Sequence, residues 1–312
     1  MTRFIVGRAV RGLVTLWIVV SAVFVVLRLS GDPARAMLGP EATPEAIEAF
    51  RTRHGLDEPI PVQYVEYLGN IARGDFGDSL KGGRPALELF LARVGATLEL
   101  GAAAVLIALA IGIPAGVLAA VKRGSLWDRL AMGGAFIGQS APNFFVGIML
   151  ILIFSLQVNL LPSSGRGEPS QLVMPAFTLA TGLLATLARM SRSALLEVIS
   201  NDYVRTARAK GLSDRDVIVT HTLRNAAIPV VTLLGLWASA LIGGAAITET
   251  VFAWPGVGRL AVAAVADRDY PVIQLIVIVV AASVVAVNLL VDIAYGLLDP
   301  RISTASSGEH HQ

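Results

Sequence analysis

The amino-acid sequence predicts an all-α polytopic membrane protein with six transmembrane helices. Of its 312 residues, 54% are apolar and only 15% are charged, and the mean hydropathy of +0.68 is too high for a soluble domain. Six apolar runs also reach the roughly 20 residues that an α-helix needs to cross a bilayer. They span residues 9–29, 97–121, 131–158, 172–196, 226–248 and 273–298.

The first run lies within residues 1–30 and follows Arg3, Arg8 and Arg11. It is longer than the apolar core of a secretory signal and has no small-residue cleavage site at its end, so we expect a retained span. Lys and Arg residues also gather between spans two and three and between spans four and five. Because cytoplasmic loops are enriched in Lys and Arg, we expect these two loops and both termini in the cytoplasm.

Residues 31–94, between the first two spans, are too many for a turn and predict a small extracytoplasmic cap. Thr43 and Pro44 suit the N-cap and first residue of a helix, and Gly55 suits its end. A second, amphipathic helix is expected at about 62–71, with Tyr64, Val65, Leu68 and Ile71 at helical spacing. The favoured role of the cap is to cover the outer rim of the spans, and contact with a delivery protein is the alternative.

The third run is interrupted near its middle by polar residues and by Pro142. Backbone groups freed at such a break need partners within the protein or in a watery cavity. The candidates to line a translocation pathway are Gln139, Ser140, Asn143 and Phe144. The alternative is a packing kink in which Asn143 forms a hydrogen bond across a helix interface.

Two pairs of glycines at a spacing of four, Gly112 with Gly116 and Gly134 with Gly138, predict close helix packing. Glu99 lies near the end of a predicted span, where a charged side chain reaches the membrane surface at low cost. We therefore expect no transport role for Glu99.

Catalytic signatures are missing from the sequence. It has no cysteine, phosphate-binding loop, zinc-protease motif or nucleophile elbow, so we expect neither an enzyme nor an ATP site in this chain. His310 and His311 lie in a polar tail, residues 301–312, that we expect to be disordered and without metal. The basic residues form no aromatic-interleaved patch, so no nucleic-acid partner is expected.

The segment 202–229 is densely charged and lies between two predicted spans. It has a helical stretch rich in Ala and Arg, then Gly211, then a short second helix that ends before Pro229. This order suits a helical hairpin that docks into a groove of a partner protein. A solvated basic loop is the alternative.

The same segment, ARAKG at 207–211 and HTLRNAAIP at 221–229, resembles the EAA motif of the membrane subunits of ATP-binding-cassette (ABC) importers. Four other stretches resemble the B-type permeases of dipeptide and oligopeptide systems: PVQYVEYLGNIARGDFGDSL (61–80), IGQSAPNFFVGI (137–148), ETVFAWPGVGRL (249–260) and RDYPVIQ (268–274). Arg205 replaces the acidic residue that names the motif, and Arg224 replaces its first proline. These departures put in doubt any acidic contact inferred from sugar or amino-acid importers.

The resemblance implies a type I ABC importer (MetI-like) transmembrane fold, with a permease core at 95–300 and a cytoplasmic coupling loop at 197–229. The implied partners are a homologous C-type permease, two ATP-binding subunits that hold ATP and Mg²⁺, and an extracytoplasmic substrate-binding protein, all acting at the lipid of the cytoplasmic membrane. The residues implied at the ATPase contact are Arg205, Ala207, Lys210, Gly211, Asp214, His221, Arg224, Asn225 and Pro229.

Dipeptides or oligopeptides are the cargo that the resemblance favours. Haem, nickel and glutathione are alternatives within the same architecture, since selection in this class falls largely to the binding protein. A stand-alone proton-coupled carrier is less favoured, because such carriers place ionisable groups inside their spans and this chain places most charges in loops or near span ends.

Overall fold

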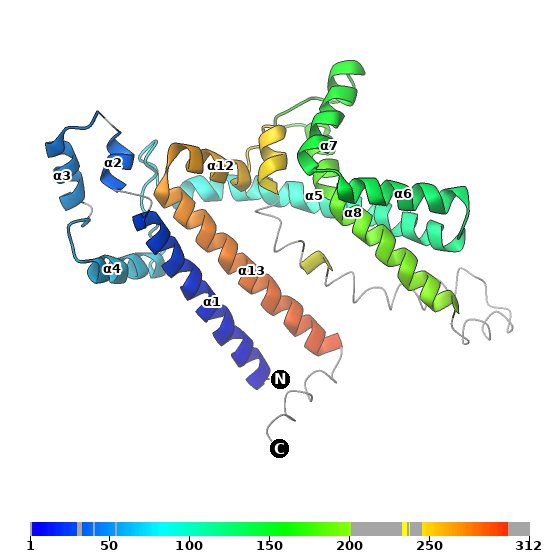
Figure 1. The fold of residues 1–312 in the computed structure, drawn as a ribbon, viewed down its shortest axis with the longest axis horizontal. Coiled ribbons are helices and arrows are strands. Elements are labelled where there is room, and N and C mark those ends of the chain that lie inside the picture. Colours follow the sequence, from blue (N-terminus) through cyan, green and yellow to red (C-terminus); the bar gives the residue numbers. More distant parts are fainter. Residues whose placement is uncertain are drawn as a thin grey trace.

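The computed structural model describes residues 2–29, 33–39, 41–53, 55–200, 233–235, 237 and 245–298. Within these ranges the fold is helical, and the prediction of an all-α protein is confirmed (Figure 1). The helices whose bounds are described are α1 (Thr2–Leu29), α2 (Pro33–Leu38), α3 (Pro44–Arg53), α4 (Ile60–Ala72), α5 (Ala86–Val121), α6 (Leu126–Ser140), α7 (Asn143–Leu150), a π-helical segment (Ile151–Gln157), α8 (Pro169–Ser200), α12 (Val257–Asp267) and α13 (Tyr270–Leu298). Residues 245–251 are also helical.

Four of the described helices contain single apolar stretches long enough to cross a membrane. These stretches are Val6–Val26 in α1, Ala86–Val121, Pro169–Glu197 in α8 and Tyr270–Val291 in α13. The predicted third span forms α6 and α7 with the π-helical segment, which together are apolar enough for a span but are bent by 110°. The predicted fifth span, 226–248, lies mainly outside the described residues.

The centre of the fold is the contact between α5 and α8, which cross in Figure 1. A Cβ atom added at Gly112 would lie 2.8 Å from the carbonyl oxygen of Leu184, and one added at Gly116 would overlap the carbonyl oxygen of Ala188. The two backbones therefore approach to a distance that only glycine permits, and the predicted role of this glycine pair is confirmed. Buried Leu100, Ala104, Ala108, Leu183 and Leu187 continue the contact.

The second glycine pair behaves differently. A Cβ atom at Gly138 would lie 3.7 Å from the carbonyl oxygen of Thr181, which is ordinary contact, and one at Gly134 would have no described atom within 4 Å. For the part of the chain that the structure describes, the prediction of close packing for this pair is wrong, because the face of α6 that carries Gly134 is not the face that packs on α8.

A second buried cluster joins α12 and α13 to the first turns of α5. Its members are Ala86, Phe90, Val257, Leu260, Ala264, Val272, Leu275 and Ile276. Helices α1 and α13 lie side by side along their lengths (Figure 1). Among the described residues, α5 therefore takes part both in the core with α8 and in the core with α12 and α13.

Helices α2, α3 and α4, which belong to the predicted cap at 31–94, lie at one end of α1 (Figure 1). The predicted N-cap is confirmed, since the hydroxyl of Thr43 accepts from the Ala46 N–H at 3.3 Å. In α4, Tyr64 bonds to Ser21 of α1 at 2.6 Å. The aromatic ring of Phe24 lies 5.2 Å from that of Tyr64. The predicted apolar face was partly wrong, because Val65 is exposed.

Candidate functional site

The predicted interruption of the third span is a true break between two helices. Helix α6 ends at Ser140, Ala141 and Pro142 have extended backbone, and α7 begins at Asn143. Proline has no N–H to continue the hydrogen bonds of α6 and disfavours helical geometry in the residue before it. The chain therefore changes direction at these two residues.

The four candidate pathway residues surround this break. Asn143 is half-buried, and its side-chain oxygen lies 3.5 Å from the hydroxyl of Thr181 in α8. That hydroxyl lies closer, at 2.8 Å, to the carbonyl oxygen of Thr178. Gln139, Ser140 and Phe144 are exposed on this chain. A packing kink can therefore account for Asn143, but it leaves three of the four candidates on the surface of the subunit.

A buried carboxylate that the sequence analysis did not identify lies at the junction of α5 and α12. Glu249 is fully buried. One of its oxygens accepts from the Thr97 hydroxyl at 2.6 Å and the other from the Arg259 N–H at 2.8 Å. Thr97 in turn accepts from the Val257 N–H at 2.8 Å. A Cβ atom at Gly256 would overlap the carboxylate, so the stretch 249–259 is folded around it.

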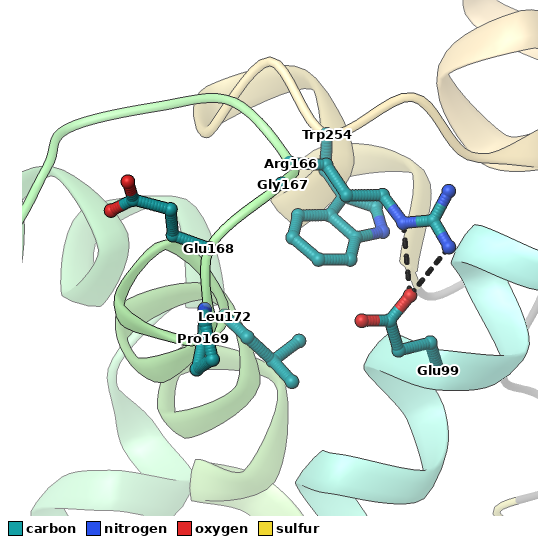
Figure 2. A pocket seen from close by; sticks show the side chains of 7 residues that line it. All are labelled: Glu99, Arg166, Gly167, Glu168, Pro169, Leu172 and Trp254. Carbon is teal, nitrogen blue, oxygen red and sulfur yellow. Dashed lines mark hydrogen bonds and ion pairs between the residues drawn. The ribbon is translucent and has the colours of Figure 1, made fainter.

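Next to this junction is a cavity of about 350 Å³, shown in Figure 2. Its lining comprises Glu99, Arg166, Gly167, Glu168, Pro169, Leu172 and Trp254. Arg166 donates through Nε and Nη2 to one oxygen of Glu99, at 2.9 and 2.6 Å. Its guanidinium also lies 5.8 Å from the ring centre of Trp254. Through this ion pair, Glu99 of α5 holds the loop 158–168, which precedes α8, against α5.

Two of the sequence stretches that resemble peptide permeases contact each other. The Ser79 hydroxyl donates to the carboxylate of Asp269 at 2.5 Å, and the Leu80 N–H donates to the same carboxylate at 3.3 Å. Lys81 pairs with Asp267 at 2.5 Å. The end of the cap is therefore fixed to the turn between α12 and α13.

The predicted ATPase-contact residues, Arg205, Ala207, Lys210, Gly211, Asp214, His221, Arg224, Asn225 and Pro229, all lie outside the described residues. The last described residue before them is Ser200, at the end of α8. Their predicted role stays a prediction.

Most of the chain is similar in sequence to known transport proteins. Residues 112–304 match the family model of the binding-protein-dependent transport system inner membrane component, and residues 1–89 match the model of its N-terminal region. The dipeptide transport system permease protein DppB of Escherichia coli K12 is 44% identical over 306 residues, 88% of this chain and 90% of that protein.

Two further relatives cover a similar share of the chain. The di/tripeptide permease DppB of Pseudomonas aeruginosa UCBPP-PA14 is 44% identical over 313 residues, 89% of this chain and 92% of that protein. The glutathione transport system permease GsiC of Escherichia coli K12 is 41% identical over 303 residues, 97% of this chain and 99% of that protein.

A solved structure has the same fold. The inward-facing MetNI methionine ABC transporter matches with a TM-score of 0.53 at 24% identity, over 66% of this chain and 96% of the matched chain. The expected MetI-like transmembrane fold is thereby confirmed. With matching family models at both ends and relatives above 40% identity, this chain belongs to the family of inner membrane components of binding-protein-dependent transport systems.

Proposed function

We propose that this chain is the B-type permease subunit of an ABC importer that carries dipeptides or oligopeptides across the cytoplasmic membrane. The observation that carries the proposal is 44% identity, along 88% of the chain, to a dipeptide transport system permease. The di/tripeptide permease of a second organism supports the same cargo at equal identity.

In this proposal the chain is one component of a larger complex. It pairs with a C-type permease, two ATP-binding subunits that hydrolyse ATP, and an extracytoplasmic substrate-binding protein. Its parts are a first span at 1–30, an extracytoplasmic cap at 31–94, the permease core at 95–300 and a tail at 301–312, with both termini in the cytoplasm. The loop 202–229 contacts an ATPase subunit, so that closure of the ATPases moves the spans as rigid bodies.

We place the translocation pathway at the break between α6 and α7. Support comes from the 110° bend and from the exposure of Gln139, Ser140 and Phe144 on this chain. A polar amide and hydroxyl beside an aromatic ring suit a peptide, which offers backbone polar groups and mixed side chains.

Glutathione is the second candidate cargo, because a glutathione permease is 41% identical over 97% of this chain. Haem and nickel fit the same architecture, but none of the relatives described above is named as a haem or nickel permease.

The test is to tag the subunit at its native locus and identify its stoichiometric companions by mass spectrometry. Uptake of labelled alanyl-alanine, trialanine and glutathione is then measured in the parent strain and in a strain without the recovered ATPase genes. We expect a second permease, ATPase chains and a binding protein, and peptide uptake that requires the ATPases. Uptake that persists without ATPases would instead favour a stand-alone carrier.

The coupling loop has its own test. Replacing Gly211 by leucine should abolish uptake while the amount of complex in the membrane stays unchanged, because a side chain would obstruct the tight turn between two helices. Normal uptake by Gly211→Leu would remove this loop from the proposed coupling.

A further inference from the structure

An ion pair joins the start of α6 to the end of α8. Arg192 donates through Nε to one oxygen of Asp128 at 2.8 Å and through Nη2 to the other at 2.9 Å. The Asp128 side chain is 9% exposed and that of Arg192 is 26% exposed. This two-point geometry fixes orientation as well as distance, which a single contact between point charges would not do.

The local sequence prepares Asp128 for this contact. Ser125 caps α6 by accepting from the Asp128 N–H at 3.4 Å, which sets the first turn. Gly124, with a φ of +77°, directs its own N–H to the Asp128 carboxylate at 2.9 Å. A residue with a side chain is strained at that φ. The carboxylate is therefore held by its own turn as well as by Arg192.

The pair lies between two parts of the molecule that the proposed function connects. Arg192 is eight residues before Ser200 and thus about 12 Å along the helix from the end of α8, just before the proposed ATPase contact at 202–229. At its other end, α6 stops at Ser140, beside the proposed pathway. Between these points α6 packs on α8 through buried Ala135, Ala185 and Ala188.

Packing and the ion pair act in different ways on relative motion of α6 and α8. The three buried residues of this interface are alanines, which project little into the facing helix, and the larger side chain packed against them, Met132, is only partly buried. Such a contact resists sliding of one helix along the other less than interlocked large side chains do. Between the two helices, the ion pair specifies one register. Without it, a displacement of α8 is no longer transferred in full to α6.

We propose that Asp128 and Arg192 are positioning residues for transport, which make α6 follow the end of α8 when the ATPase subunits move the coupling loop. The inference rests on the proposed function, because it takes the loop after Ser200 as the point where force enters. The ion pair touches no cargo. It determines how much of the movement at the ATPase contact reaches the break at Ala141 and Pro142.

The test uses the complete complex with its native partners, purified and reconstituted in liposomes with the binding protein. Uptake of labelled alanyl-alanine and ATP hydrolysis are measured together. Asp128→Asn should lower uptake per ATP hydrolysed by about fivefold or more, the lower end of typical coupling between sites. Arg192→Lys keeps the charge but loses the two-point contact. Its uptake per ATP hydrolysed should therefore lie between the values for the unaltered complex and for Asp128→Asn.

The chain offers a matched control on the same helix. Arg189 is exposed and lies three residues before Arg192, so Arg189→Lys makes the same chemical change without touching the pair. It should leave uptake per ATP unchanged. If Asp128→Asn lowers only the amount of assembled complex and leaves this ratio unchanged, the pair is a structural contact and the proposal is overturned.

A second measurement does not depend on cargo. The sequence has no cysteine, so spin labels can be placed at Arg129→Cys in α6 and Arg189→Cys in α8, both exposed positions. The distance between the labels should stay constant on ATP binding in the otherwise unaltered complex and change in the Asp128→Asn background. If ATP binding changes the label distance equally in the unaltered complex and in the Asp128→Asn complex, the proposal is overturned. Absence of peptide uptake by the unaltered complex, in contrast, would count against the proposed cargo alone.

Discussion

Glu249 and Asp128 are both buried carboxylates, but their surroundings differ. Glu249 accepts from a hydroxyl and a backbone N–H, and its described hydrogen-bond partners include no cation. Asp128 accepts from a guanidinium on another helix as well as from a backbone N–H. The comparison shows one chemical group used in two ways. Glu249 fixes the fold of a turn, whereas Asp128 links two long helices through a contact that one charge change can break.

The largest expected effect on stability is at Glu249. In Glu249→Ala the Thr97 hydroxyl and the Arg259 N–H lose their acceptor in a buried site, and a cavity opens. We expect the free energy of unfolding to fall by about 3–5 kcal/mol. The measurement is the drop in melting temperature of the detergent-solubilised complex that carries the substitution, relative to the unaltered complex. A melting temperature equal to that of the unaltered complex would mean that water reaches this site.

Thr97→Val sharpens the comparison, since it removes the hydroxyl with little change in shape. It leaves the Val257 N–H without its acceptor and Glu249 without one donor. The expected cost is about 2–3 kcal/mol, determined from the same melting curves. Thr97→Ser, which keeps the hydroxyl, is the control and should retain most of the stability.

Asp128→Asn should lower the melting temperature less than Thr97→Val, because Arg192 is a quarter exposed and can turn toward water when its partner loses charge. Its effect on uptake per ATP should nevertheless be larger than that of Thr97→Val. The opposite ranking in either measurement would remove the distinction between a contact that fixes a turn and one that links two helices.

The smallest effect is expected at Glu99. The Glu99 and Arg166 side chains are 42% and 41% exposed, and exposed ion pairs contribute at most about 1 kcal/mol. Glu99→Gln should change the melting temperature little, and less still at high salt. A strong loss of uptake by this variant, with the complex intact, would give the cavity beside Trp254 a role in transport.

Features that depend on neighbouring residues were predictable from the sequence. Thr43 and Pro44 start a helix as expected, because the cap is made by groups three residues apart. Gly112 and Gly116 were also identified correctly, since only small residues allow close helix packing. Pro142 predicted a break in the third span but not its 110° bend, which depends on how α7 packs against α8.

The contacts of Glu249 and Asp128 could not be predicted in the same way. Thr97 is 152 residues from Glu249 in sequence, and Arg192 is 64 residues from Asp128. Such pairs form only once the helices are packed. One local signal was present, because Ser125 followed three residues later by Asp128 is typical of a capped helix start. It locates Asp128 in a first turn, although it does not reveal Arg192.

The close approach of α5 and α8 at Gly112 and Gly116 also bears on electrical insulation. Backbone atoms of α8 occupy the space where side chains of α5 would stand, so the seam between these helices has no room for a file of water molecules. A bilayer that holds a proton gradient needs every protein within it to be as impermeable as the lipid. Where Gly112 and Gly116 meet α8, the packing therefore leaves no water-filled route for protons or ions between the two helices.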